Sequence, residues 1–277
     1  MNTITAIATA ESLHDIDFDR RFGGIARLYG DAALARFRTA HLCVIGVGGV
    51  GSWVVEALAR SAIGHVTLID LDNVAESNIN RQIQALSDTL GQAKVTALAE
   101  RIAQINPFCR VTEVEDFITP DNLDQMIGAH EFDYVIDAID NVKAKAALIA
   151  YCRTKAIPLI TIGSAGGQTD PTKIAVCDLA RTEQEPLLAK VRKILRAQYG
   201  FSRGTKSKFG IDAVFSSEPL RFPAADESCA LETDSVTDTR AGVTGLNCAG
   251  FGSAMVVTAS FGLVAAAHVL RKLAQEE

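Results

Sequence analysis

The sequence lacks the residue spacings that build structural metal sites. Its six cysteines are scattered along 277 residues, and no two of them form a C-x-x-C pair. The tetrathiolate spacing of a structural zinc site is therefore absent. The five histidines show no metal-ligand spacing either. A chain of this length can bury a large core without metal or disulfide cross-links.

The amino terminus also lacks the pattern of an export signal. Residues 1–5 contain neither a basic segment nor the long apolar segment of a secretory signal. Together with the free thiols, this predicts a cytoplasmic protein. The net charge of −6 argues against a protein that coats nucleic acid indiscriminately, although it leaves room for a local basic patch.

Charged residues are missing from one long stretch, residues 250–270. The stretch is long enough to span a bilayer, so membrane association through it is one alternative. Glycine, serine, threonine and histidine interrupt it, and much of the rest is alanine and valine. We therefore favour a helix buried within the domain, and we expect no stable membrane partner.

What the chain does contain is an alternation of short apolar runs and helical patterns. Apolar runs predict strands at residues 42–45, 65–69, 110–114, 134–136 and 159–162. Helical spacing is found at residues 31–38, 52–61, 93–104, 122–126 and 143–154. Beyond Pro171 the pattern predicts strands at residues 173–178 and 211–215 and a long loop at residues 222–247. The alternation predicts an α/β fold, Rossmann-like and doubly wound around a mainly parallel sheet, with additional C-terminal strands and a buried C-terminal helix.

A glycine-rich turn follows the first of these predicted strands. Gly46, Gly48 and Gly51 have the spacing G-x-G-x-x-G, with Gly49 inside it, and a predicted helix follows. Such glycines permit a tight turn and a close approach of backbone N–H groups to phosphate. Asp70 ends the second strand, where it is placed to accept hydrogen bonds from a ribose hydroxyl. Taken alone, the pattern also suits an NAD-dependent dehydrogenase or a merely tight strand–helix turn.

A polar cluster after Asp70 favours a different chemistry. Its members are Asp72, Ser77, Asn78, Asn80, Arg81, Gln82 and Lys94. Hydride transfer creates no charge on phosphate, whereas attack of a carboxylate on the α-phosphate of ATP does. Arg81 and Lys94 are the donors that could stabilise this charge and that of the departing pyrophosphate. The alternative for either residue alone is a solvated polar loop with a lysine at the start of a helix.

A third polar element ends the next buried strand and runs from Asp137 through Asp140 to Asn141. Carboxylates at the carboxyl ends of parallel strands face the ligand crevice. Asp140 could hold Mg²⁺ against phosphates, because Mg²⁺ favours one or two carboxylates plus phosphate oxygens and water. Asp137 could instead cap the following helix.

In order and spacing, these blocks resemble the ThiF/MoeB superfamily of ubiquitin-activating-type adenylating enzymes. The resemblance implies one domain over residues 1–277, with an ATP-binding part at residues 20–170 and an extension with substrate-binding loops at residues 171–277. It implies ATP and Mg²⁺ as cofactors, with Arg81, Lys94 and Asp140 catalytic and Asp140 binding the metal. The implied cofactor-binding residues are Gly46, Gly48, Gly49, Gly51, Asp70, Asp72, Ser77, Asn78, Asn80, Arg81, Gln82, Lys94, Asp140 and Asn141.

Within that superfamily the chain resembles the branch that acts on threonylcarbamoyladenosine in tRNA. The resemblance rests on residues 21–30, 137–140, 145–152, 163–168, 170–171 and 250–261. It implies an ATP-dependent ligase or dehydratase that cyclises N6-threonylcarbamoyladenosine by adenylating its carboxylate, and it implies a homodimer. Related dimeric members send a second arginine into the neighbouring site, but Gly24 occupies the corresponding position. Of the arginines nearby, we favour Arg21 as the catalytic one, with Arg20 and Arg27 as the alternatives.

Two other functions remain open at this stage. One is adenylation of a carrier-protein carboxyl terminus for sulfur transfer, and the other is a nucleotide-binding scaffold of a cysteine-desulfurase or sulfur-acceptor system. A loop thiol, Cys229, could serve such chemistry, but Asp226 and Glu227 beside it would oppose a low thiol pKa. The missing C-x-x-C pairs, and the lack of a ubiquitin-fold or rhodanese extension, favour a small-molecule or RNA-borne carboxylate.

One segment is basic in spite of the negative net charge. Between Ala189 and Gly210 there is no acidic residue, and the basic residues are Lys190, Arg192, Lys193, Arg196, Arg203, Lys206 and Lys208. Such a concentration suits contacts with the phosphates of tRNA. The alternative is an ordinary solvated helix face followed by a loop.

Overall fold

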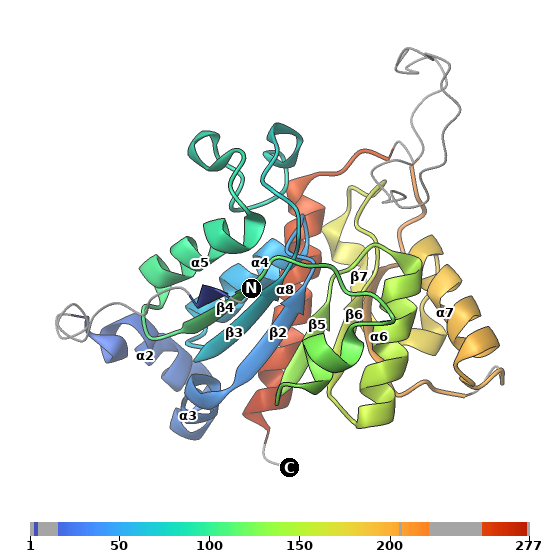
Figure 1. The fold of residues 1–277 in the computed structure, drawn as a ribbon, viewed down its shortest axis with the longest axis horizontal. Coiled ribbons are helices and arrows are strands. Elements are labelled where there is room, and N and C mark those ends of the chain that lie inside the picture. Colours follow the sequence, from blue (N-terminus) through green and yellow to red (C-terminus); the bar gives the residue numbers. More distant parts are fainter. Residues whose placement is uncertain (1–2, 5–15, 205–206, 222–250, 276–277) are drawn as a thin grey trace.

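The computed structural model describes residues 3–4, 16–204, 207–221 and 251–275 (Figure 1). Three features of the sequence prediction lie outside these ranges: the loop at residues 222–247, Cys229 and Lys206. Within them one sheet has the strand order β1-β4-β3-β2-β5-β6-β8-β7. In chain order the strands are β1 (Thr3–Ile4), β2 (His41–Ile45), β3 (His65–Ile69), β4 (Arg110–Val114), β5 (Tyr134–Asp137), β6 (Leu159–Ile162), β7 (Ile174–Asp178) and β8 (Asp212–Ser216).

All pairings in the centre of the sheet are parallel, and only the two edge strands, β1 and β7, pair antiparallel with their neighbours. The long helices are α2 (Phe18–Tyr29), α3 (Asp31–Thr39), α4 (Gly51–Arg60), α5 (Lys94–Ile105), α6 (Val142–Lys155), α7 (Pro186–Gln198) and α8 (Met255–Ala274). The prediction of a doubly wound, mainly parallel α/β fold is confirmed. The short helix predicted at residues 122–126 is η3, which begins two residues later (Asp124–Gly128).

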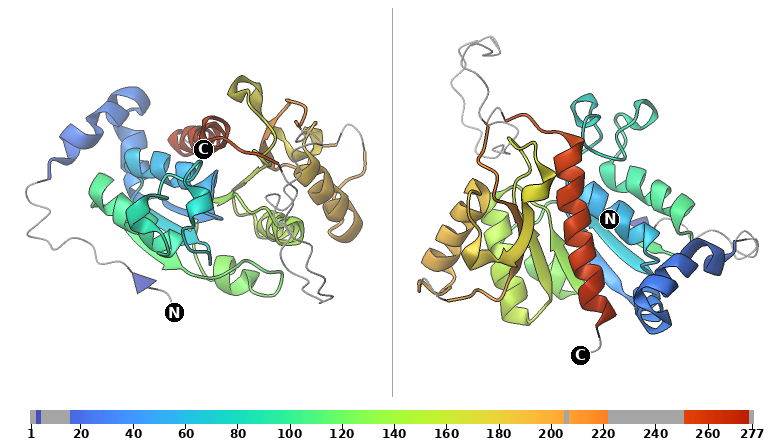
Figure 2. Two further views of the ribbon diagram at one scale, coloured as in Figure 1. Left: turned by 90° about the horizontal axis from the view of Figure 1, so that it is seen from above. Right: turned by 180° about the vertical axis from the view of Figure 1, so that it is seen from behind.

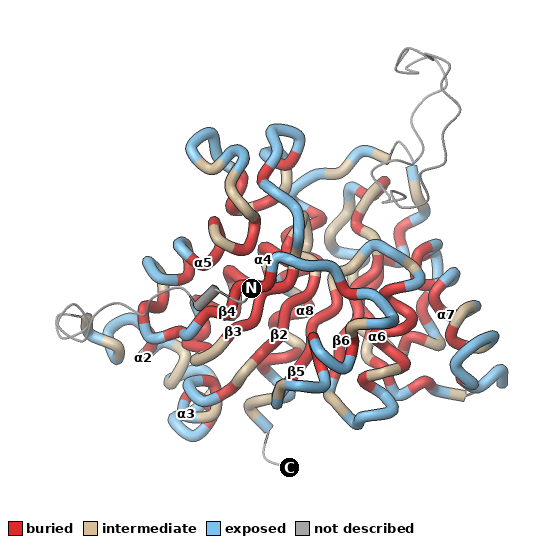
Figure 3. The backbone as a smooth tube through the Cα atoms, viewed as in Figure 1, coloured by how far each residue is buried: buried red, intermediate tan, exposed pale blue. Residues whose placement is uncertain are grey.

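The central strands are buried on both faces, which explains their continuous apolar runs. Successive side chains of a strand point to opposite faces. Leu42 and Val44 of β2 accordingly join one core cluster with residues of α3, α4, α5 and α8. Cys43 and Ile45 join a second cluster with residues of α6 and α7. Figure 3 shows this burial following the sheet and the inner sides of its helices.

The chain folds outward from β2 in two directions. The strands β3 and β4 follow on one side of β2, and β5 and β6 follow on the other. The order of the sheet therefore reverses between β2 and β5. In doubly wound folds, ligands bind in the crevice outside the carboxyl ends of the strands at such a point.

The apolar stretch at residues 250–270 forms most of α8, which packs within the fold. Figure 2 shows α8 running along one face of the sheet. Nine of its residues are buried, among them Phe261 and Val269. At Gly262, a Cβ would lie 2.5 Å from the carbonyl oxygen of Val50, so the glycine permits close packing on α4. Although α8 is long and apolar enough to cross a membrane, half of its most apolar 18-residue segment is buried inside the fold. This burial favours the core-helix interpretation.

Candidate nucleotide-binding site

A pocket of about 590 Å³ opens at the carboxyl ends of the central strands, where the strand order reverses. Eleven of the predicted cofactor-binding residues line it: Gly46, Gly48, Gly49, Gly51, Asp70, Asp72, Arg81, Gln82, Lys94, Asp140 and Asn141. The sequence prediction and the sheet topology therefore converge on one place. The Ser77, Asn78 and Asn80 side chains are the predicted binders that do not line the pocket.

Two glycines of the turn after β2 are required by its geometry. Gly46 has a φ of +80°, and a Cβ there would lie 2.9 Å from the carbonyl oxygen of Ala138. At Gly51 a Cβ would lie 1.9 Å from the carbonyl oxygen of Gly46. No larger residue fits either position without moving the backbone. The turn consequently leads into α4, and Gly48, Gly49, Val50 and Gly51 line the pocket, where a phosphate site needs backbone N–H groups.

Asp70 holds this turn as well as facing the pocket. One carboxylate oxygen, Oδ2, accepts a hydrogen bond of 2.8 Å from the backbone N–H of Val47. The other, Oδ1, accepts from the backbone N–H of Asp72 at 2.9 Å and lies 3.8 Å from Nζ of Lys94. Burial raises the pKa of Asp70, and the Lys94 charge and these backbone donors oppose that rise. The carboxylate is thus preorganised at the position expected for ribose recognition.

Lys94 is the first residue of α5, and its side chain is buried at the pocket. Its Nζ forms an ion pair of 2.7 Å with Oδ2 of Asp72, and its backbone N–H donates to the Asp72 carbonyl. The Asp72 side chain is 61% exposed but that of Lys94 only 7%, so a ligand that replaces Asp72 must offer Lys94 another negative charge.

Arg81 comes from the excursion between β3 and α5. Its guanidinium donates to the carbonyl of Ser77 at 2.7 Å and to Oδ1 of Asn80 at 2.9 Å. Its methylenes lie against Gly49, where a Cβ would be 3.1 Å from Cδ of Arg81. Burial lowers its pKa. Trp53 of α4 fixes the backbone beneath, because its Nε1 donates to the Arg81 carbonyl at 2.9 Å.

Ser77, Asn78 and Asn80, the predicted binders outside the pocket, stabilise the conformation of this segment between β3 and α5. Oδ1 of Asn78 accepts from the backbone N–H of Ala75 at 3.1 Å. Asn80, besides binding Arg81, donates to the carbonyl of Ser253 at 2.9 Å and so ties the excursion to the segment before α8. A direct contact of Ser77, Asn78 or Asn80 with a nucleotide stays a prediction.

At the end of β5 the two aspartates have separate surroundings. Asp140 is exposed and lines the pocket, and it makes no hydrogen bond or ion pair within the described part of the chain. Asp137 is fully buried and forms an ion pair of 3.0 Å with the equally buried Lys145. The expectation that Asp137 caps the next helix is wrong, because Asn141 is the N-cap of α6 and accepts from the backbone N–H groups of Lys143 and Ala144.

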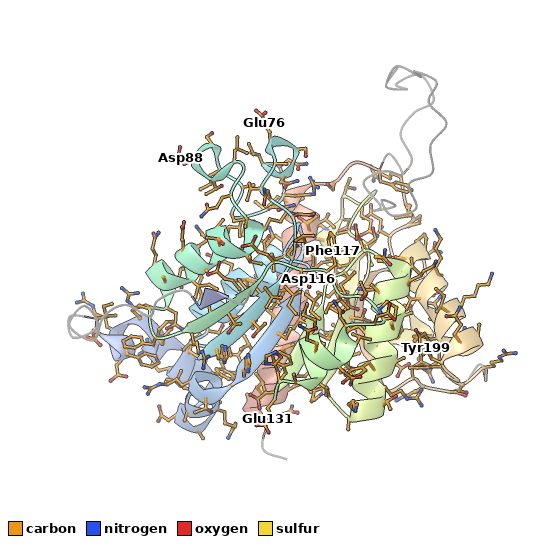
Figure 4. The ribbon with its side chains drawn as sticks, in the orientation of Figure 1. Glu76, Asp88, Asp116, Phe117, Glu131 and Tyr199 are labelled. Atoms are coloured by element: carbon orange, nitrogen blue, oxygen red, sulfur yellow. The ribbon has the colours of Figure 1, made fainter. Side chains whose placement is uncertain are left out.

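Sequence reasoning missed several residues of the site. Gln84 is buried, and its Nε2 donates to the Val47 carbonyl at 3.0 Å and to Oε1 of Gln82 at 3.1 Å. The residues 116–119 after β4 and the residues 163–166 after β6 also line the pocket. Figure 4 shows Asp116 and Phe117 over this edge of the sheet, while Glu76 and Asp88 point away from it. Residues 116–119 and 163–166 could have been predicted as pocket residues, because each segment directly follows a parallel strand.

Arg21 does not reach the pocket of its own chain. Its guanidinium donates to the carbonyls of Gln104 and Ile105 at the end of α5, at 3.2 and 2.9 Å. These contacts suit a cation at a helix C-terminus. A contact of Arg21 with a neighbouring subunit's site stays a prediction.

A glycine turn at the reversal point of a parallel sheet, with a ribose-side acid and two basic side chains, defines a nucleotide-binding α/β protein. The model of the ThiF family matches residues 20–277, and the chain belongs to that family. The motif-based identification of the superfamily is confirmed.

Relatives narrow the comparison. The tRNA threonylcarbamoyladenosine dehydratase of Escherichia coli is 55% identical over 92% of this chain and 93% of its own length. The Haemophilus influenzae protein of the same name is 53% identical over 94% and 96%. The structure of the E. coli enzyme, TcdA, in complex with ATP superimposes with a TM-score of 0.81 at 50% identity, covering 97% of each chain. The same enzyme has also been solved in complex with AMP, with the same TM-score, 51% identity and the same coverage.

Proposed function

We propose that this protein is an ATP-dependent dehydratase that cyclises N6-threonylcarbamoyladenosine in tRNA by adenylating its carboxylate. The relatives of that name are more than half identical over nearly the whole chain, and one of them binds ATP and AMP. The observation that carries the proposal is the pairing of Arg81 and Lys94 beside the glycine turn. A site for hydride transfer needs no such pair, whereas a site for adenylation does.

The reaction has two steps, adenylation of the carboxylate and ring closure. A carboxylate oxygen of the substrate attacks the α-phosphorus of ATP, and the bond to pyrophosphate breaks. A nucleophilic atom of the same modified base then attacks the activated carbonyl carbon, AMP leaves with the former carboxylate oxygen, and a ring closes. The oxygen leaves with AMP and the nucleophilic atom releases its proton, so the substrate loses the elements of water. Arg81 and Lys94 stabilise the charge that grows on the phosphates in the first step.

Asp140 is suited to hold Mg²⁺. Its carboxylate is exposed in the pocket and has no protein partner among the described residues, so its oxygens are available to a cation. Those residues hold no cluster of three acidic, histidine or cysteine side chains, so phosphate oxygens and water would complete the coordination. Bound there, Mg²⁺ would neutralise charge on the phosphates.

The residues after β4 suit the adenine end of the nucleotide. The Phe117 side chain is 54% exposed although it lines the pocket, and Ile118 beside it is buried. The strand β3, which the ribose-side Asp70 follows, pairs with β4. An aromatic ring beyond the ribose position offers a stacking surface for a purine.

Two neighbouring helices offer a surface for the tRNA backbone. The helices α6 and α7 pack together, and neither contains an acidic residue. Lys190 and Lys193 of α7 are exposed, and so are Arg203 and Lys208 after it. Arg192 is set apart because it donates to the Thr182 hydroxyl. Against a net charge of −6, this surface favours phosphate contacts over an ordinary solvated helix face.

Three further features belong to the same proposal. The protein acts as a homodimer, in which Arg21 reaches the partner's site, and it works in the cytoplasm. A carrier-protein substrate with sulfur transfer is less favoured, because no cysteine lines the part of the pocket that the structure describes. Interaction with a cysteine-desulfurase or sulfur-acceptor system would then be a separate function.

The test compares pyrophosphate release from ATP in three reactions, with threonylcarbamoylated tRNA, with unmodified tRNA and with candidate carrier proteins. Stimulation by the modified tRNA alone is the expected result. Stimulation by a carrier protein would replace the proposal with the sulfur-transfer function. Release of no pyrophosphate under any condition would leave a nucleotide-binding scaffold.

A further inference from the structure

The carboxyl ends of five strands line the pocket in a fixed order. Along the sheet they are residues 116–119 after β4, Asp70 after β3, the glycine turn after β2, residues 138–141 after β5 and residues 163–166 after β6. Neighbouring strands are about 4.8 Å apart, so the β3 and β6 ends are separated by roughly 14 Å. On the proposed function, on which this inference rests, the nucleotide occupies the β4–β3–β2 end. The substrate carboxylate then approaches from the β6 end.

The β6 end is a wall of small residues with one free hydroxyl. Gly163, Ser164, Ala165 and Gly166 all line the pocket, with Leu187 of α7 beside them. Oγ of Ser164 accepts a hydrogen bond of 3.3 Å from the backbone N–H of Gly166. No described residue accepts the hydroxyl hydrogen of Ser164 in return. The half-buried side chain therefore has one donor to offer a ligand.

A buried carboxylate fixes this wall from behind. Glu185 is the N-cap of α7 and is only 4% exposed. Its Oε1 accepts from the backbone N–H of Ser164 at 2.7 Å, and its Oε2 accepts from that of Leu188. At Gly163 a Cβ would lie 3.0 Å from Cγ and Cδ of Glu185, so the two segments are in close contact. Because Glu185 occupies the backbone donor of Ser164, the hydroxyl is the donor left for the pocket.

We infer that the Ser164 hydroxyl donates a hydrogen bond to an oxygen of the threonylcarbamoyl group and so sets recognition of the substrate. Glu185 is a positioning residue that acts through Ser164. The ligand chemistry is a carboxylate-bearing acyl substituent, since carbonyl and carboxylate oxygens are the acceptors it presents. Nothing in this contact involves the nucleotide.

The main test is Ser164→Ala in steady-state assays with threonylcarbamoylated tRNA and ATP. Loss of one hydrogen bond to a bound substrate raises the KM for modified tRNA about tenfold. The kcat and the KM for ATP stay within about twofold, because the contact is made equally in the ground and transition states. Ser164→Thr keeps the hydroxyl and restores the wild-type KM. Binding of unmodified tRNA is unchanged by Ser164→Ala.

Ser216→Ala is the matched control. Oγ of Ser216 also accepts from the backbone N–H two residues later, that of Glu218, at 3.1 Å, but Ser216 does not line the pocket. It removes the same kind of local hydrogen bond and leaves both KM values unchanged.

A double-mutant cycle tests the positioning role of Glu185. Glu185→Gln keeps the shape of the side chain but replaces one of its two accepting oxygens with an NH2 group, which cannot accept from a backbone N–H, and raises the KM for modified tRNA about threefold. In the Ser164→Ala background the same change leaves that KM unaltered, because the contact it positions is gone. Additive effects would overturn the role of Glu185.

The outcomes separate this inference from the proposed function. A wild-type KM for modified tRNA in Ser164→Ala, with the wild-type enzyme active, overturns the inference and leaves the function standing. An equal rise in the KM for ATP also overturns it. If the wild-type enzyme does not turn over modified tRNA, the proposed function fails and this inference fails with it.

Discussion

The two ends of the central sheet treat titratable side chains in opposite ways. At the amino ends of β2 and β3, the rings of His41 and His65 are stacked with centroids 3.5 Å apart. Burial, helped by neighbouring histidines and Arg110, lowers the pKa of each to about 4, so both rings are neutral near pH 7. At the carboxyl ends, Lys94 and Lys145 are buried beside carboxylates.

The two ends differ in the hydrogen-bond and ion-pair partners that they provide for a titratable side chain. Each histidine pairs through Nε2 with a threonine hydroxyl, His41 with Thr67 at 2.8 Å and His65 with Thr112 at 3.0 Å. A hydroxyl suits a neutral ring. The lysines have aspartates, which offset the desolvation of a cation. Buried charge is thus retained at the end of the sheet where the pocket opens, and is avoided by these histidines at the opposite end.

The largest expected effect tests whether the carboxyl-end charges are needed for the fold. Lys145→Ala leaves Asp137 buried and without its cation, and should lower the free energy of unfolding by about 3–5 kcal/mol. Urea denaturation measures it. Lys143→Ala, two residues earlier on α6 and exposed, should change stability by less than about 0.5 kcal/mol. A loss within about 1 kcal/mol for Lys145→Ala would mean that the pair contributes little.

The second prediction concerns charges needed for chemistry alone. Arg81→Ala removes a donor to the developing phosphate charge, and should lower kcat about 10²–10³-fold. Asp140→Ala should abolish product, and both variants should keep the wild-type melting temperature within a few degrees. Arg60→Ala, an exposed arginine paired with Glu56, is the control and should retain full turnover. Near-normal turnover of Arg81→Ala would refute its assigned role.

A smaller effect is expected for a neutral group at the same end. Gln84→Ala leaves the Val47 carbonyl without its side-chain donor, at a cost of about 1–3 kcal/mol in unfolding free energy. The glycine turn then loosens, so the Kd for ATP should rise several-fold. Isothermal titration with ATP and urea denaturation measure the two effects. Gln104 is exposed on α5, and Gln104→Ala should change neither the free energy of unfolding nor the binding of ATP.

The smallest effect is the pH dependence of the histidine end. The folded pKa values of about 4 lie below the ordinary 6.5, so the unfolded chain binds more protons between these values. The free energy of unfolding should therefore fall as the pH drops from 6.5 to 4, by about 1 kcal/mol after allowance for half-burial. Above pH 6.5 the pair has no such effect.

The double variant His41→Gln, His65→Gln should lose less stability than the wild type across this pH window, as followed by urea denaturation at several pH values. Identical pH profiles would show that the stacked pair is not responsible. Asp133, whose charge raises the pKa of His41, and His130, which lowers it, remain in both proteins.

Much of the fold was predictable because its signals are local. Apolar runs marked β2 to β6, and the glycine spacing marked the turn at Gly46. The helix α2 was missed because Gly23 and Gly24 weaken its helical pattern, although Asp17 caps it by accepting from the backbone N–H of Arg20. The edge strand β1 has two residues and depends on pairing with β4, which no local pattern reveals.

The residues of the candidate site also differ in how far local sequence predicts them. The Arg81, Lys94 and Asp140 positions were predictable from residue type and order along the chain. The Asn78 and Asn80 side chains were assigned to the nucleotide by the same reasoning; in the structure Asn78 accepts from the backbone of Ala75, and Asn80 contacts Arg81 and the Ser253 carbonyl, so their contact with a nucleotide stays a prediction. Gln84, Phe117 and Ser164 were missed because their importance comes from the neighbours that the fold gives them.

By itself the sequence determined where a nucleotide site is expected, after the first strand, because glycine spacing and the following acid are chemical requirements of a phosphate and ribose site. It also determined the doubly wound fold, through apolar runs that only a two-sided burial satisfies. Only the tertiary structure decided which polar groups face the pocket and which hold its walls. That division depends on which side chains meet across the sheet, and residues such as Ser164 and Glu185 acquire their partners only when distant segments pack.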